Sequence, residues 1–144
     1  MIRQEDFIVC EDVRLEVSGM MTLVGFFAGA LRIPNPGSLK LSFALVVDGM
    51  KGVDRFLLMV ETRQGKEVLS KTGVIECKRQ AQVDSHTIVH TISPFPAPRA
   101  GKYDIRVTIE TSTVTETFTK TIAIDIGPQT GPARPGHASD KGSA

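Results

Sequence analysis

The chain has 144 residues, of which 23% are charged, and its formal net charge at neutral pH is +1. This balance gives no long-range field that would concentrate nucleic acid or an anionic membrane surface, so we expect neither as a partner. With no Trp and only one Tyr, the aromatic platforms on which single-stranded nucleic acid stacks are also scarce.

The two cysteines, Cys10 and Cys77, could form one disulfide if a domain of this size were secreted. Glu5 and Asp6 stand where a secretory signal needs basic residues followed by an apolar segment. The longest uncharged run, residues 17–31, has 15 residues and three glycines, which is shorter than the roughly 20 residues of a membrane helix. We therefore expect a cytoplasmic protein with reduced thiols.

The first predicted strand covers residues 7–17, where apolar and polar side chains alternate. Ser18-Gly19 is typical of a tight turn. The returning run, residues 20–29, is apolar at almost every position. A strand there needs cover on both faces, either from the proline-containing loop at residues 31–39 or from another subunit.

A hairpin is predicted next, with strands at residues 39–47 and 56–60 and a glycine-containing turn at residues 48–52. Leu57 and Met59 make its second strand apolar on both faces as well.

Two more strands are predicted at residues 67–77, after the turn at Gln64-Gly65, and at residues 83–92. The segment 93–98 then contains three prolines. Proline cannot donate a ladder hydrogen bond, so we expect this segment to cross in extended form from one sheet to the other.

The clearest alternation lies at residues 101–109, and a final strand with threonines on its exposed side follows at residues 115–126. Seven to eight short strands without helical periodicity indicate an all-β fold. We predict a single-domain antiparallel β-sandwich of the immunoglobulin-like, Greek-key type over residues 1–126. Residues 127–144, with three Pro and four Gly, are predicted to be a flexible, disordered tail.

Two stretches resemble known patterns. Residues 98–107 resemble the Gly-x-Tyr-x-x-x-Val start of a late strand in immunoglobulin-like sandwiches, in which the tyrosine hydroxyl, here that of Tyr103, ties down the preceding corner. Residues 10–27 resemble the start of a family of small bacterial proteins of unknown function, in which Cys-Asp-x-x-Arg-x-Glu leads through a glycine turn to Leu-x-Gly-x-Tyr. Phe27 stands at the position of that tyrosine. The resemblance implies a bacterial, cytoplasmic protein and implies no activity.

A serine hydrolase is an alternative with little support in the sequence. If residues 78–82 close a regular hairpin, Ser70 lies opposite His90, which would allow a Ser–His hydrogen bond. Catalysis also needs an acid behind the histidine and an oxyanion hole, and no residues with these roles can be named. We therefore predict no catalytic residue and a protein that is not an enzyme.

No metal or cofactor site is predicted either. His86 and His90 are four residues apart on a strand, which separates them by about 13 Å at the usual rise. Cys10 is flanked by two acidic residues that raise a thiol pKa, so we interpret it as a packing residue.

The surplus of apolar side chains on the two doubly apolar strands is the main indication of function. The predicted interface residues are Met20, Met21, Phe26, Phe27, Leu57 and Met59. The leading hypothesis is a non-enzymatic protein-interaction module that docks a protein partner or forms a homo-oligomer. The alternative is a small-molecule-binding β-sandwich with an apolar pocket between the sheets or under the loop at residues 31–39.

Overall fold

The computed structural model describes residues 1–18, 20–25 and 30–127, and within these ranges the chain forms strands and no helix. The described strands are β1 (Arg3–Cys10), β2 (Asp12–Leu15), β3 (Met21–Val24), β4 (Ala30–Ile33), β5 (Gly37–Asp48), β6 (Arg55–Gln64), β7 (Glu67–Lys71), β8 (Ile75–Lys78), β9 (His86–Ala97), β10 (Gly101–Glu110) and β11 (Thr115–Ile126). The all-β prediction is confirmed. No helix capable of crossing a membrane occurs in the described ranges. The predicted tail falls almost wholly on residues 128–144, outside the described residues.

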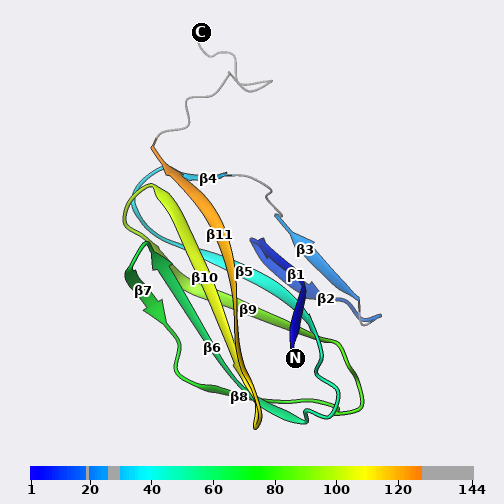
Figure 1. Ribbon diagram of the computed structural model, residues 1–144. Helices are drawn as coiled ribbons and strands as arrows, with labels where there is room; N and C mark the ends of the chain where they lie inside the picture. The colour runs from blue at the N-terminus through cyan, green and yellow to red at the C-terminus, as the bar shows by residue number, and fades with distance from the viewer. Residues whose placement is uncertain (19, 26–29, 128–144) are drawn as a thin grey trace.

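The strands form two sheets that enclose one core, together with a separate hairpin (Figure 1). The three-stranded sheet has the order β1-β5-β9, and the six-stranded sheet has the order β4-β11-β10-β6-β7, with β8 paired to β6 beside β7. β2 and β3 pair only with each other among the described strands. The pairings are antiparallel except that of β4 with β11. The result is a sandwich-like arrangement of two facing sheets.

The regular alternation at residues 101–109 forms β10, the central strand of the six-stranded sheet. Its inward side chains, Tyr103, Ile105, Val107 and Ile109, are all fully buried. A strand that buries one face and exposes the other produces this period of two.

The structure contains eleven described strands, where the sequence predicts seven or eight. The predicted first strand bends at Glu11 and becomes β1 and β2. Residues 67–77 also divide, because β7 and β8 pair with opposite ends of β6. The predicted loop at residues 31–39 contains most of β4.

The predicted hairpin of residues 39–47 with residues 56–60 is wrong. β5 lies in the three-stranded sheet and β6 in the six-stranded sheet. The turn between them crosses the end of the core, where the side chain of Met50 is fully buried. Both strands present an apolar row to the same core, and that pattern fits strands that face each other as well as strands that pair.

The predicted crossing at residues 93–98 is placed too early, because the chain passes from the three-stranded to the six-stranded sheet only at residues 98–100, between β9 and β10. β9 continues through its prolines and pairs with β5 as far as Ala97, opposite Gly37. β9 is an edge strand of its sheet, and an edge tolerates proline because one side of the strand has no ladder partner. The ladder accommodates the segment with a register shift between Leu39 and Leu41.

Candidate functional site

Two of the predicted interface residues lie on the outer face of the six-stranded sheet. Leu57 and Met59 are half-buried and alternate along β6 with the buried core residues Phe56, Leu58 and Val60. The alternation directs the two side chains away from the core. Across the sheet, Met59 lies opposite Thr108 on β10.

Met20 and Met21 lie elsewhere, at the start of the second strand of the β2–β3 hairpin, where their side chains are 70% and 37% exposed. The structure therefore does not join them with Leu57 and Met59 on one element or one sheet. The other two predicted interface residues, Phe26 and Phe27, lie outside the described residues.

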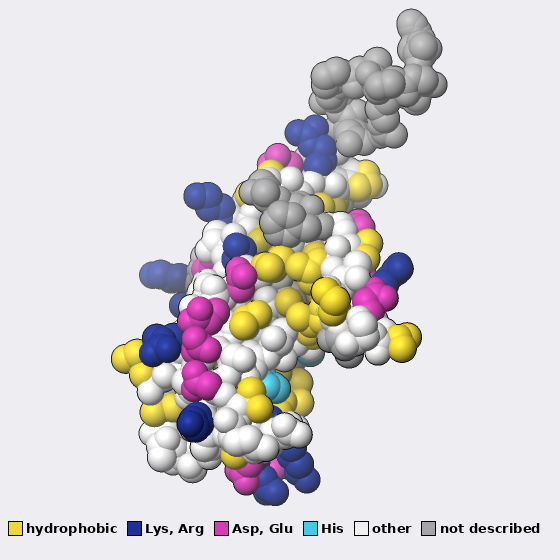
Figure 2. Space-filling view, turned by 90° about the vertical axis from the view of Figure 1, so that its right-hand side faces the viewer, with side chains coloured by type: hydrophobic (Ala, Val, Ile, Leu, Met, Phe, Trp, Pro, Cys, Tyr) yellow, Lys and Arg dark blue, Asp and Glu magenta, His cyan; other side chains and the backbone are white. Residues whose placement is uncertain are grey.

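Apolar side chains gather on the side of the molecule that carries the β2–β3 hairpin (Figure 2). The six-stranded sheet has β11 and β4 at one edge. Apolar side chains on these strands pack against the core yet stay partly exposed, namely Leu31, Ile33, Phe118 and Ile126. These four side chains are therefore partly accessible to solvent.

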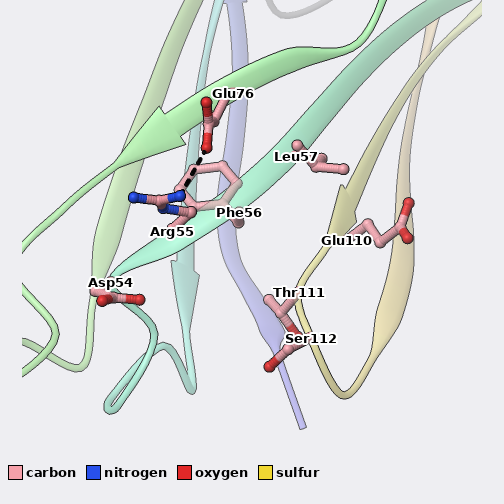
Figure 3. Close-up of a pocket in the computed structure, with 8 residues that line it drawn as sticks. All are labelled: Asp54, Arg55, Phe56, Leu57, Glu76, Glu110, Thr111 and Ser112. Carbon is pink, nitrogen blue, oxygen red and sulfur yellow. Dashed lines mark ion pairs between the residues drawn. The ribbon is translucent and has the colours of Figure 1, made fainter.

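A cavity of about 410 Å³ is hollowed into the outer face of the six-stranded sheet where β6 begins (Figure 3). Leu57 lies at its centre, opposite Glu76 on β8 and Glu110 on β10. Arg55 forms an ion pair with Glu76 at 3.4 Å, and Asp54 adds a third carboxylate to the lining. The cavity is therefore acidic.

A second cavity, of about 350 Å³, opens at the sandwich edge between β7 and β9. Ser70 and His90 both line it, but from different sheets. The hairpin that would pair them is absent from the described strands, since Ser70 lies opposite Thr62 and His90 lies opposite Phe43. The Ser70 hydroxyl is hydrogen-bonded to the hydroxyl of buried Thr62 at 2.6 Å.

His86 and His90 lie on the inner face of β9 rather than on a solvated sheet face. The ring of His86 packs against Phe56 and that of His90 against Phe43, with ring centroids 5.4 and 5.8 Å apart. Burial lowers the pKa of both imidazoles, and the charge of Arg79 lowers the pKa of His86 further. Both rings therefore favour the neutral form.

Cys10 and Cys77 are free thiols on strands of different sheets. Burial raises the pKa of both thiols. Since the thiolate is the reactive form, this favours a packing role. Within the described ranges, His, Cys, Asp and Glu side chains form no group of three that could hold a metal ion.

No family model matches the chain, and no curated protein matches it in sequence. Among solved structures, the crystal structure of the C-terminal domain of wzt is similar at 10% sequence identity and a TM-score of 0.46. The match covers 90% of this chain and 75% of that chain. A likeness at this level does not extend to function.

Proposed function

We propose that the protein is a non-enzymatic protein-interaction module that associates through the side carrying the β2–β3 hairpin. The observation that carries the proposal is the exposure of Met20 and Met21 on a two-stranded hairpin that belongs to neither main sheet. A hairpin of this size is marginally stable alone in water. Flexible methionine side chains suit adaptable contacts, and clustered exposed apolar side chains mark interaction sites.

A second copy of this chain is the partner that best fits the edge of the hairpin. β3 pairs only with β2 among the described strands, so its other edge presents unpaired N–H and C=O groups. An identical β3 from a second copy can pair with that edge in antiparallel fashion about a two-fold axis. Apolar side chains gathered on the same side of the molecule (Figure 2) add apolar surface to such a contact.

The test is the solution mass of the full chain by light scattering across a dilution series. We expect a dimer that Met21→Asp dissociates, with the Asp variant still folded by circular dichroism. Val74→Asp is the matched control, because Val74 is 61% exposed and follows β7 at the other edge of the six-stranded sheet. Met59→Asp tests the outer face of that sheet. A monomer at all concentrations, or dissociation by Met59→Asp alone, contradicts the proposed surface.

The alternative is a small-molecule-binding sandwich, which the cavity between β7 and β9 supports because its volume of about 350 Å³ is in the range of ligand pockets. It predicts saturable thermal stabilisation of the protein by a metabolite at constant oligomeric mass.

A hydrolase using Ser70 and His90 has less support, since Thr62 already binds the serine hydroxyl. Unchanged turnover in His90→Ala would exclude it.

We also propose that the sandwich is of the immunoglobulin-like, Greek-key class. The hydroxyl of buried Tyr103 donates to the backbone carbonyl of Arg99, and the Arg99 N–H donates back at 3.3 Å. This corner is characteristic of that class.

A cytoplasmic, bacterial setting remains part of the proposal, and the two free thiols on separate sheets suit a reducing compartment.

A further inference from the structure

A small cavity on the outer face of the six-stranded sheet is lined mainly by cations and hydroxyls. Its volume is about 130 Å³, and it lies at the opposite end of β6 from the acidic cavity. The lining residues are Met59, Glu61, Arg63, Lys71, Arg106, Thr108 and Thr117. Three positive charges thus surround one carboxylate.

The ladder register brings these charges together. On neighbouring strands, Glu61 lies opposite Arg106 on one side and Lys71 on the other. Its carboxylate instead forms an ion pair with Arg63, two residues along β6. Neither Arg106 nor Lys71 forms an ion pair with any described residue.

Arg106 carries a donor without an acceptor. Its Nε is shielded from solvent and has no hydrogen-bond partner within the described part of the chain. The nearest carboxylate on the same face of β10, that of Asp104, accepts a hydrogen bond from Thr121 at 2.7 Å and does not line the cavity. The rest of the Arg106 guanidinium is the part that can serve a ligand in the cavity, because Arg106 lines it and a guanidinium binds oxyanions in bidentate fashion.

The hydroxyls add a further donor. The Thr108 and Thr117 side chains are 3.1 Å apart and share one hydrogen bond. Each hydroxyl has one proton, so one of the two keeps a proton to donate elsewhere. The volume of about 130 Å³ is well below the range of pockets for drug-sized ligands, so the cavity suits a small ligand.

The geometry points to a binding site for a phosphate-type oxyanion on the outer face of the six-stranded sheet, held by Arg106 and Lys71 with a threonine hydroxyl. This site is independent of the association surface on the hairpin side. The ligand class is a free phosphate ion or a phosphate monoester whose organic part extends from the open face of the cavity.

Isothermal titration of the full chain with inorganic phosphate, at constant ionic strength, tests the site. We expect saturable binding that Arg106→Gln and Lys71→Gln each weaken about tenfold or more, since each removes a hydrogen bond between charged groups worth roughly that factor. Lys102→Gln is the matched control: it removes the same charge from the same face of β10 but does not line the cavity. Glu61→Gln is expected to tighten binding by removing the only anion of the lining.

Thermal unfolding of each variant without phosphate checks that the fold is retained. Titration with glycerol phosphate in parallel separates the two sources of the ligand, because tighter binding of the ester assigns the site to a monoester and tighter binding of the free ion assigns it to phosphate. Absence of saturable binding by both ligands overturns the inference. Equal weakening by Lys102→Gln and Arg106→Gln also overturns it, because binding would then reflect only the general charge of the face.

Discussion

The imidazole of His86 meets the ring of Phe56 edge to face, with the ring centroids 5.4 Å apart and the ring planes at 77°. His86 belongs to β9 in the three-stranded sheet and Phe56 to β6 in the six-stranded sheet, so this contact joins the two sheets. His90 makes a similar contact with Phe43 inside the three-stranded sheet. Burial lowers the pKa of both histidines, so both rings favour the neutral form in the folded protein.

We expect the free energy of unfolding to fall as the pH is lowered below about 6.5, the usual histidine pKa. Both folded-state pKa values lie below that of the unfolded chain, so the unfolded state binds more protons in this range and stability rises with pH. Urea unfolding at intervals from about pH 5.5 to 7.5 measures the slope. The double variant His86→Gln, His90→Gln is expected to flatten it, and an unchanged slope in that variant would contradict the assignment.

Tyr103→Phe is expected to destabilise the protein by about 1–3 kcal/mol, because the carbonyl of Arg99 loses its donor at a part-buried corner. The ring itself keeps its place against Phe95, whose centroid is 5.7 Å away. Chemical denaturation measures the change. Ile105→Val, on the same inward row, is the control for a small packing loss and is expected to cost about 0.5–1.5 kcal/mol. A neutral Tyr103→Phe would mean that the corner hydrogen bonds add nothing to stability.

The sequence predicts strands well where one face is buried, as at residues 101–109, because burial on one side alone produces a period of two. It does not predict which strands pair. β5 and β6 each carry an apolar row at every second position that faces the core, yet they lie in different sheets. Alternation indicates that one face of a strand is buried, but it does not indicate the sheet to which the strand belongs. The prolines of β9 led to the prediction of a crossing segment for a related reason. Whether proline interrupts a strand depends on whether the strand lies at the edge of its sheet, which the sequence does not show.

For the candidate sites as well, the sequence indicates which residues are unusual but not which of them lie together. The apolar surplus at Leu57 and Met59 is visible in the sequence, and the structure leaves both half-buried on an outer face. Their separation from Met21 depends on tertiary structure and has no local signal. Lys71 and Arg106 are 35 positions apart and meet around Glu61 only through the ladders of β7, β6 and β10. No motif in the sequence marks that meeting.

Thr62 is a fully buried polar residue of the core, and a double-mutant cycle with Ser70 should show that the two hydroxyls act as a pair. Their oxygens are 2.6 Å apart. Thr62→Val and Ser70→Ala are each expected to cost about 1 kcal/mol, with the double variant costing less than the sum because each single change removes the same hydrogen bond. Urea unfolding of the four proteins gives the coupling energy. Additive costs would show that the hydroxyls stabilise the fold independently.

Gly49 and Gly52 form a natural pair for separating backbone strain from steric clash in the turn between β5 and β6. Their φ angles are +85° and +88°, a region that costs an L-residue about 1–2 kcal/mol. A Cβ at Gly52 would meet nothing within 4 Å, whereas one at Gly49 would lie 2.1 Å from the backbone oxygen of Met1. The start of the chain cannot easily move away, because the neighbouring Ile2 side chain is buried in the core.

We therefore expect Gly52→Ala to cost about 1–2 kcal/mol and Gly49→Ala to cost more. Deletion of Met1 should lower the cost of Gly49→Ala in chemical denaturation, since it removes the clashing carbonyl and leaves only the tighter-than-usual contact with the Ile2 Cα at 3.2 Å. Equal costs for the two substitutions in the full chain would show that the N-terminus does not pack against this turn.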